Sequence, residues 1–164
     1  MKLIVMRHGR AETPRATLPD SERALTAQGK ALISSQGIAM ARGGLKPDVV
    51  FCSPYLRARQ TASLLCEAFE LEPLVVRSLG PGADLEAYGA LVDEWAGSGC
   101  LLTVHHQPDV SGVIYALSGI HVPMGEGYAA VLDVRRIAAG GAVLAGFYEA
   151  GVMARLGGFK ESGY

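Results

Sequence analysis

The sequence predicts an α/β fold: a three-layer sandwich with a mostly parallel central sheet and helices on both faces. Short apolar runs of strand length alternate along the chain with amphipathic segments of helical length. Such alternation is typical of parallel sheets that are covered by helices. Hydrophobic residues make up 49% and charged residues 19% of the 164 residues. This balance supports a sizeable core, and we expect a single domain over residues 1–164.

The N-terminal part predicts one strand, one long loop and one helix. Residues 2–6 form an apolar, partly β-branched run that indicates a buried strand. The polar stretch from Arg10 to Arg23 contains two prolines and indicates a loop. Thr26 is expected to cap the following helix, which Gly43-Gly44 ends.

The rest of the chain continues the alternation. The further predicted strands are residues 49–52, 74–76, 101–104, 131–134 and 143–147. The predicted helices between them are residues 56–69, 84–95 and 110–117. The last two strands are close in sequence and joined by Ala139-Gly140-Gly141, so we expect them to form a hairpin.

Polar residues follow three of these predicted strands. They are Arg7-His8 after the first, Ser53 to Arg57 after the second, and His105-His106 after the strand at 101–104. A single His or Arg at a strand end is more often structural or solvated. In parallel sheets, however, ligands bind outside the carboxyl ends of the strands. The combination therefore predicts that these three segments converge on one pocket.

The residue types in this set favour phosphoryl transfer. Arginine offers planar donor forks that match phosphate oxygens, and a neutral histidine is a nucleophile that can accept a phosphoryl group. The cations would stabilise the equatorial oxygens of the transition state, so this chemistry requires no metal and no other cofactor. The four His and three Cys residues also lack zinc-ligand spacing.

Four ordered motifs resemble the histidine phosphatase superfamily, also called the phosphoglycerate mutase-like fold. Arg7-His8-Gly9 is similar to its signature, and residues 53–62 (SPYLRARQTA) are similar to its second arginine motif. Residues 104–108 (VHHQP) resemble its second histidine motif, and residues 23–29 (RALTAQG) resemble an element between the first two motifs. The short chain further resembles the SixA-type phosphohistidine phosphatases.

The resemblance implies a role for each matching residue. His8 matches the nucleophile that becomes phosphohistidine, and Arg7 and Arg57 match the two arginines that grip the phosphate. His106 matches the second histidine of the pocket. Gly9 is expected to permit a tight turn, with its carbonyl group orienting the His8 ring.

The adjacent histidines must be distinguished from each other. Successive strand residues point to opposite faces, so only one of the pair is expected to enter the pocket. The spacing to Pro108 in the motif selects His106 and leaves His105 as a structural residue.

The general acid of the family has no clean match. Arg10 stands where many members carry Glu or Gln after Arg-His-Gly. Asp84 is the first candidate for the acid, with Glu86, Asp20 and Glu22 as alternatives, although a solvated charge is the commoner role for each. An alcohol leaving group requires a proton donor. The P–N bond of phosphohistidine releases a better leaving group, so a weak or absent acid is tolerable.

The sequence therefore predicts a metal-independent phosphatase that works through a phosphohistidine at His8. The first substrate class is phosphohistidine on a protein, such as a phosphotransfer domain of a two-component relay. The alternatives are small phosphate monoesters (a sugar phosphate or a nucleotide), a mutase reaction, and a non-catalytic phosphate-binding module.

The charge balance and the hydropathy pattern argue against nucleic acid and membranes as partners. Fifteen Lys and Arg against sixteen Asp and Glu give a net charge of −1, which argues against binding nucleic acid by bulk charge. The apolar runs are of strand length, which argues against a signal segment or a membrane span. Three cysteines, an odd number, imply no disulfide framework, so we expect a cytoplasmic protein.

Overall fold

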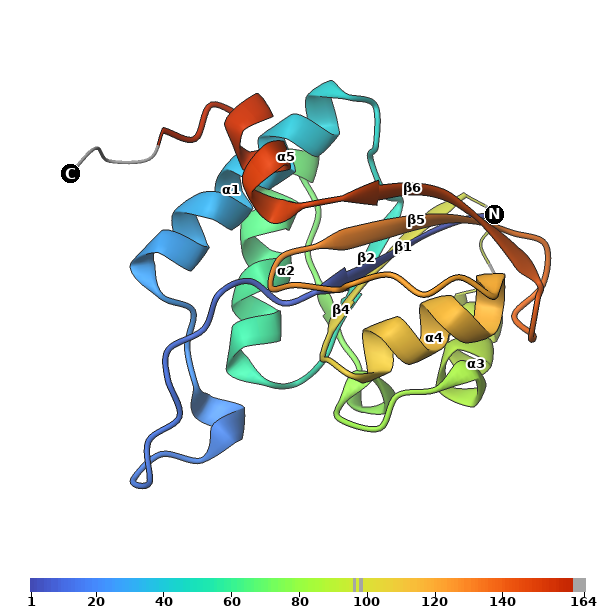
Figure 1. The fold of residues 1–164 in the computed structure, drawn as a ribbon, viewed down its shortest axis with the longest axis horizontal. Helices are drawn as coiled ribbons and strands as arrows, with labels where there is room; N and C mark the ends of the chain where they lie inside the picture. The colour runs from blue at the N-terminus through green and yellow to red at the C-terminus, as the bar shows by residue number, and fades with distance from the viewer. Residues whose placement is uncertain (96, 98, 161–164) are drawn as a thin grey trace.

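The computed structural model describes residues 1–95, 97 and 99–160 (Figure 1). In these residues the strands are β1 (Lys2–Arg7), β2 (Val49–Cys52), β3 (Leu74–Val75), β4 (Cys100–His105), β5 (Ala129–Val134) and β6 (Ala142–Tyr148). The α-helices are α1 (Ala27–Arg42), α2 (Leu56–Phe69), α3 (Leu85–Trp95), α4 (Asp109–Ser118) and α5 (Ala150–Leu156). Short 3-10 helices occur at η1 (Asp20–Glu22) and η2 (Arg77–Leu79).

The described strands form one mixed sheet in the order β3-β2-β4-β1-β5-β6. The pairs β3–β2, β2–β4 and β4–β1 are parallel. The pairs β1–β5 and β5–β6 are antiparallel, and the latter is the hairpin that the sequence indicates. The expectation of a mostly parallel sheet is confirmed.

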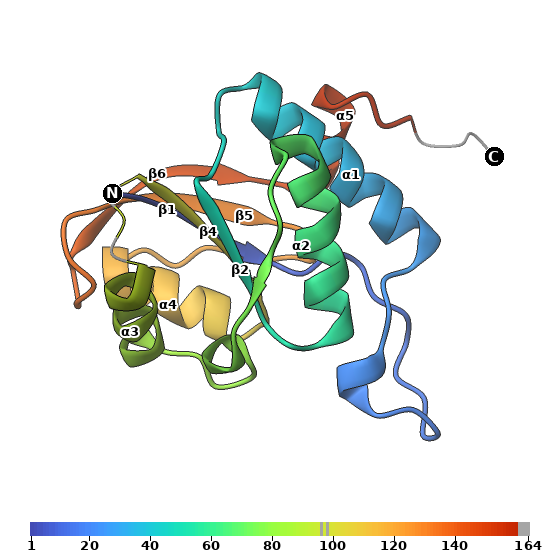
Figure 2. The same cartoon turned by 180° about the vertical axis from the view of Figure 1, so that it is seen from behind.

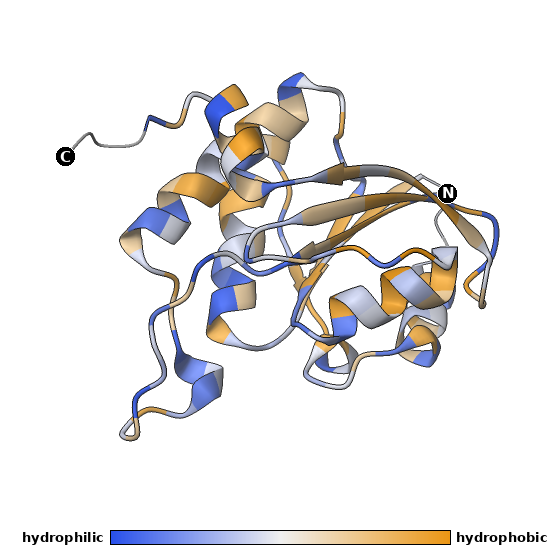
Figure 3. Cartoon of the chain, in the orientation of Figure 1, coloured by the Kyte–Doolittle hydropathy of each residue, from blue (hydrophilic) through white to orange (hydrophobic). Residues whose placement is uncertain are grey.

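Helices cover both faces of the sheet. In β1, the side chains of Leu3 and Val5 pack in one apolar cluster with α3 and α4. Those of Ile4 and Met6 pack in the other cluster, with α1, α2 and α5. Figures 1 and 2 show these two helix layers from opposite sides, and in Figure 3 the central strands are largely hydrophobic while the segment at η1 is hydrophilic. Because β1 is buried on both faces, its sequence is continuously apolar rather than alternating.

The largest differences from the sequence expectations concern one helix and one edge strand. Helix α5 is absent from the sequence-based prediction, because its short segment has no cap signal and little apolar periodicity. Strand β3 is a two-residue edge strand with exposed side chains, one residue shorter than the strand expected at 74–76. The first long helix begins as expected, since Thr26 Oγ1 accepts a hydrogen bond from the backbone N–H of Gly29 at 2.9 Å.

The parallel register brings three strand ends to the same edge of the sheet. Arg7 pairs with His105, and Cys52 pairs with Val104. The ladder continues one residue further, where the N–H of His8 donates to His105 O and the N–H of Ser53 donates to Val104 O, both at 3.0 Å. The polar segments singled out in the sequence are therefore neighbours in space.

Candidate active site

His8 stands at the carboxyl end of β1 with a defined tautomer. Its side chain is buried, and its Nδ1 lies 2.8 Å from the carbonyl oxygen of Gly9. A carbonyl oxygen can only accept, so Nδ1 carries the ring proton and donates it to this bond. Nε2 therefore keeps its lone pair, and it accepts a hydrogen bond from Arg57 Nε at 3.1 Å. The turn thus presents a neutral imidazole with an unprotonated nitrogen.

Arg57 lies in the first turn of α2, where every guanidinium nitrogen has a partner. Besides the bond from Nε to His8, Nη1 donates to the backbone oxygen of Asp20 at 2.6 Å. Nη2 donates to Asp20 Oδ2 at 2.8 Å. The guanidinium carbon also lies 4.9 Å from the centre of the Tyr55 ring. These contacts hold a buried cation beside His8.

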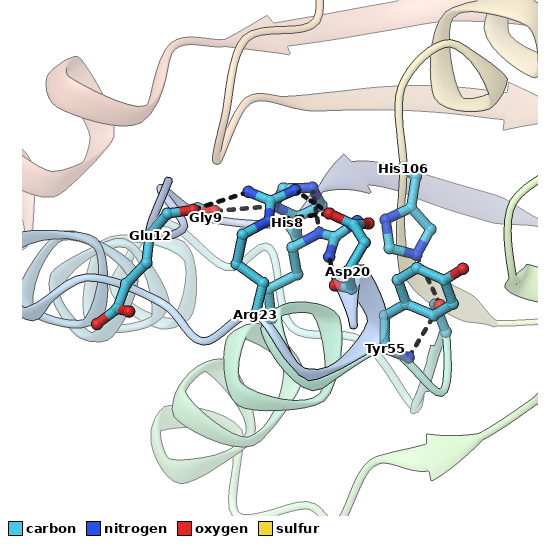
Figure 4. A network of polar contacts seen from close by, with 9 residues as sticks. His8, Gly9, Glu12, Asp20, Arg23, Tyr55 and His106 are labelled. Carbon is cyan, nitrogen blue, oxygen red and sulfur yellow. Dashed lines mark hydrogen bonds and ion pairs between the residues drawn. The ribbon is translucent and has the colours of Figure 1, made fainter. Parts of the chain in front are cut away.

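His106, the first residue after β4, adds a second imidazole. Its ring centroid lies 5.3 Å from that of His8 and 4.8 Å from that of Tyr55. Its Nε2 is 2.7 Å from Ser53 Oγ, which also accepts a hydrogen bond from the backbone N–H of Tyr55 at 3.3 Å. Figure 4 shows His106 and Tyr55 side by side next to Asp20 and His8. The ends of β1, β2 and β4 thus each contribute to one site.

Arg7 completes the positive surroundings of His8. Its Nη1 donates to Met124 O at 3.0 Å, while its Nε is buried with no hydrogen-bond partner among the described residues. The same holds for His106 Nδ1. A buried polar atom without a partner costs about 1–3 kcal/mol, so these nitrogens suit a site that receives a polar ligand. We call Arg7, His8, Arg57 and His106 the His–Arg cluster.

Burial and neighbouring cations keep both histidines of the cluster neutral. Desolvation, and after it the charges of Arg57, His106 and Arg7, lower the pKa of His8 to about 3, although the bond to Gly9 opposes the shift. Desolvation and then the charge of Arg57 lower the pKa of His106 to about 4. At neutral pH the Nε2 lone pair of His8 is therefore available for attack on an electrophile.

The turn that carries His8 is locked by helices α1 and α2. A Cβ atom on Gly9 would lie 2.7 Å from Cγ1 of Ile33 in α1, so no larger residue fits there without displacement. Gly9 is thus needed for this close approach, and it does not adopt a positive φ angle. Its N–H donates to Thr61 Oγ1 at 2.9 Å, and that hydroxyl donates to Arg57 O at 2.7 Å. The hydroxyl links the His8 turn directly to the helix that carries Arg57.

Comparison with known proteins identifies the family. The family model described as the histidine phosphatase superfamily (branch 1) matches residues 3–80. An uncharacterized protein from a Picosynechococcus strain is 33% identical over 130 residues, which cover 74% of this chain and 78% of that protein. The chain belongs to the histidine phosphatase superfamily. It is a phosphatase that works through a histidine.

Solved structures share the fold of this histidine phosphatase. The protein histidine phosphatase SixA in complex with tungstate aligns with a TM-score of 0.82 and 24% identity, over 93% of this chain and 99% of that one. The alpha-ribazole phosphatase from Shigella flexneri aligns with a TM-score of 0.67 and 19% identity, over 92% and 97%. The fold is thus found in phosphatases named for a protein substrate and for a small molecule.

His105 of this histidine phosphatase points away from the His–Arg cluster. It is fully buried, and its Nε2 lies 2.8 Å from the hydroxyl of Tyr88 in α3. The same hydroxyl lies 2.7 Å from Thr103 Oγ1. Adjacent strand residues project to opposite faces, so His105 enters the apolar layer under α3 while His106 enters the site.

Asp84 lies outside the contacts of the His–Arg cluster. Its Oδ1 accepts a hydrogen bond from the N–H of Ala87 at 3.0 Å, which caps the start of α3. It lines a hollow of about 490 Å³ between the starts of α3 and α4. In the described residues, no hydrogen bond or ion pair joins Asp84, Glu86 or Glu22 to the cluster. Of the four carboxylates considered from the sequence, it is Asp20 that contacts it.

Sequence reasoning did not assign functional contacts to three residues near the cluster. Arg23 pairs with Asp20, Tyr55 lies against Arg57 and His106, and Thr61 ties Gly9 to α2. All three lie within quoted motifs, residues 23–29 and 53–62. Their positions were therefore visible, but which atoms they contact depends on how the motifs pack together.

Proposed function

We propose that this enzyme removes the phosphoryl group from phosphohistidine on a protein, through a transient phosphohistidine at His8. The neutral ring and the unprotonated Nε2 support His8 as the nucleophile. Arg7, Arg57 and His106 are the groups that hold the phosphoryl oxygens, because they surround Nε2 with donors and positive charge.

The reaction has two displacements at phosphorus. His8 Nε2 attacks the phosphorus as the P–N bond to the substrate ring breaks, and the bonding electron pair returns to that ring. Water then attacks the phosphorus of phospho-His8, which releases phosphate and regenerates the free imidazole. For the first step, the Arg57 Nε donor must leave His8 Nε2 and turn to the phosphoryl oxygens.

The ionised state of Asp20 supports phosphohistidine rather than an alkyl phosphate ester as the substrate. Partial burial raises the pKa of Asp20, but hydrogen bonds from Arg57 and Arg23 outweigh it and hold the pKa below its ordinary value. At neutral pH this carboxylate has no proton to give. An alkyl ester needs a donor for its leaving alkoxide, whereas an imidazole leaving group does not. Asp20, which contacts the cluster, therefore cannot supply the proton that an ester leaving group needs, and this supports a P–N bond as the substrate.

The protein substrate is also supported by the exposure of Asp20 beside the cluster. The carboxylate side chain of Asp20 is 53% exposed although it contacts buried Arg57. A residue on the surface of a folded partner, such as a phosphotransfer domain of a two-component relay, can reach such a site. The close fold match to the protein histidine phosphatase SixA agrees with this proposal.

A substrate panel tests the proposal. The purified enzyme is incubated with a histidine-phosphorylated phosphotransfer domain, a sugar phosphate, a nucleotide and para-nitrophenyl phosphate, with His8→Ala as the blank. We expect kcat/KM to be highest for the phosphohistidine protein. Higher kcat/KM for the sugar phosphate or the nucleotide would overturn the substrate class. Activity on none of the four would instead favour a non-catalytic phosphate-binding module.

We further propose a cytoplasmic, metal-independent enzyme. The described residues contain no helix that is long and apolar enough to cross a membrane. Cys52, Cys66 and Cys100 are free thiols whose pKa burial raises to about 12, 11 and 11, so they stay protonated and inert. Activity that is lost in EDTA and restored by a divalent cation would contradict the metal-independent mechanism.

A further inference from the structure

Asp20 reaches the His–Arg cluster from an exposed segment. It begins η1, in the loop between β1 and α1, and its side chain is 53% exposed, whereas that of Arg57 is 6% exposed. Asp20 Oδ2 accepts a hydrogen bond from Nη2 of Arg57. Asp20 Oδ1 lies 3.0 Å from Nε and 2.9 Å from Nη2 of Arg23. Figure 4 shows Asp20 between Arg23 on one side and His106 with Tyr55 on the other.

The Asp20 carboxylate accepts a hydrogen bond from Arg57 Nη2, a donor that a bound phosphoryl group also needs. Arginine recognises phosphate with two parallel N–H bonds, yet Arg57 already gives Nε to His8 and both terminal nitrogens to Asp20. His8 and Arg57 are buried at a strand end and in a helix, so apart from the release of Arg57 Nε from His8 their packing restricts their movement. The exposed Asp20 side chain is the partner that can yield.

Arg23 keeps a displaced Asp20 carboxylate close to the site. Besides its bonds to Asp20 Oδ1, Arg23 donates from Nη1 to the backbone oxygen of Glu12 at 3.0 Å. Its side chain is only 16% exposed. When a phosphoryl group binds Arg57, Oδ1 of Asp20 can stay hydrogen-bonded to Arg23. Oδ2 of Asp20 is then released next to the bound substrate.

We propose that Asp20 determines substrate specificity: it competes with the phosphoryl group for Arg57 and, once displaced, accepts a hydrogen bond from the protonated imidazole ring of the substrate. The competition follows from the contacts between Asp20 and Arg57 alone. The role of Asp20 toward the leaving imidazole rests on the proposed function, since it requires a phosphohistidine substrate.

Cleavage of the P–N bond and departure of the substrate imidazole need no further reactant. The substrate ring enters with phosphorus on one nitrogen and a proton on the other, as a phosphoimidazolium. Asp20 Oδ2 accepts from that N–H and favours this cationic form. When the P–N bond breaks, the electron pair returns to the ring nitrogen, and the ring departs as neutral imidazole with its N–H in place. An ester has no such cation, so the carboxylate gives it no help.

The test compares Asp20→Asn with Glu22→Gln. Glu22 belongs to the same 3-10 helix and is exposed, and its side chain forms no hydrogen bond or ion pair with the described residues. Both variants remove one negative charge from the same segment. The measurements are the inhibition constants of inorganic phosphate and tungstate, and kcat/KM for a phosphohistidine protein and for para-nitrophenyl phosphate. Asp20→Ala repeats each measurement with a second neutral side chain.

We expect inhibition constants to fall by about 5-fold in both Asp20 variants and to stay at the wild-type value in Glu22→Gln. The ratio of kcat/KM for phosphohistidine over para-nitrophenyl phosphate should fall by roughly 10-fold or more in the Asp20 variants alone. Unchanged inhibition constants would overturn the competition, and an unchanged ratio would overturn the leaving-group role.

Failure of the proposed function gives a different pattern. In that case the wild-type enzyme prefers a small ester to the phosphohistidine protein, and the leaving-group role falls with it. The competition is then still decided by the inhibition constants, because phosphate and tungstate carry no leaving group. Inhibition that weakens in the Asp20 variants would show that Asp20 supports the phosphate site rather than competing for it.

Discussion

At the scale of single residues, one backbone carbonyl sets the chemistry of the nucleophile. Gly9 O accepts from His8 Nδ1, so the ring proton is held on the side away from Arg57. The opposite tautomer would place an N–H against the Arg57 donor and leave no lone pair for attack. This one bond therefore decides which ring nitrogen can take a phosphoryl group.

Replacement of His8 by alanine should abolish turnover and preserve the fold. The variant loses the Nε2 lone pair, so we expect kcat/KM to fall by roughly 1000-fold or more. The assay is transfer of radioactive phosphate to the protein, as an acid-labile phosphoenzyme in the wild type and none in the variant. Circular dichroism checks the fold. Near wild-type turnover by a folded variant would eliminate the phosphohistidine mechanism.

The two adjacent histidines should respond oppositely to alanine substitution. His106→Ala removes a ring of the cluster, and we expect kcat/KM to fall by roughly 100-fold or more. His105→Ala removes a buried partner of Tyr88, so it should cost about 1–3 kcal/mol of unfolding free energy and leave kcat/KM within about 3-fold. Urea denaturation and steady-state kinetics on both variants give the comparison. The reverse order would exchange the roles of the pair.

At the scale of elements, helix α5 depends on a close contact with α1. A Cβ atom on Gly157, the C-terminal cap of α5, would overlap the backbone oxygen of Ser35 in α1. Backbone atoms cannot move aside as a flexible side chain can. The glycine therefore lets the two helices approach, on the same face of the sheet as α2 but away from the His–Arg cluster.

Gly157→Ala should destabilise the protein without changing its chemistry. We expect the unfolding free energy to fall by about 1–3 kcal/mol, because α5 must shift from α1. Gly151→Ala is the matched control in the same helix, where the added Cβ would meet only Arg155 Nη1 at 3.6 Å. That control should be neutral or stabilising by about 0.5–1 kcal/mol. Equal stability of the two variants in urea denaturation would disprove the close contact.

At the scale of the whole molecule, burial of neutral histidines links stability to pH. Desolvation lowers the pKa of His8 and His105 to about 3 and that of His106 to about 4, from an ordinary value near 6.5. In the unfolded chain these rings take up protons as the pH falls below about 6.5. The folded protein does not, so the unfolded state binds more protons between about pH 6.5 and 4.

Stability should therefore be greatest above about pH 6.5 and decline on acidification. Each buried histidine contributes a slope of up to about 1.4 kcal/mol per pH unit in that interval. The measurement is the unfolding free energy at pH 7.5, 6 and 5. His105→Gln should reduce this slope by up to about 1.4 kcal/mol per pH unit relative to wild type, because one titrating ring is removed. Stability that rises as the pH falls to 5 would contradict burial of the neutral rings.

Much of the fold could be predicted from the sequence because its signals are local. The apolar run at residues 2–6 marks β1, Thr26 marks the start of α1, and the alternation of elements indicates the mostly parallel sheet. Parallel topology then brings Arg7-His8, Ser53 and His106 to one edge, since carboxyl ends of parallel strands lie together. These inferences need only the side-chain periodicity and the capping chemistry of neighbouring residues.

Only the tertiary structure decided which atoms meet. Asp20 contacts Arg57 across 37 residues of sequence, while Asp84, the first-ranked acid, caps α3 instead. The close approach of Ile33 to Gly9 and the burial of His105 against Tyr88 likewise join different elements. A local pattern records the face on which a residue lies. It does not record the partner that packing places there, because that partner is set by how separate elements fit in three dimensions.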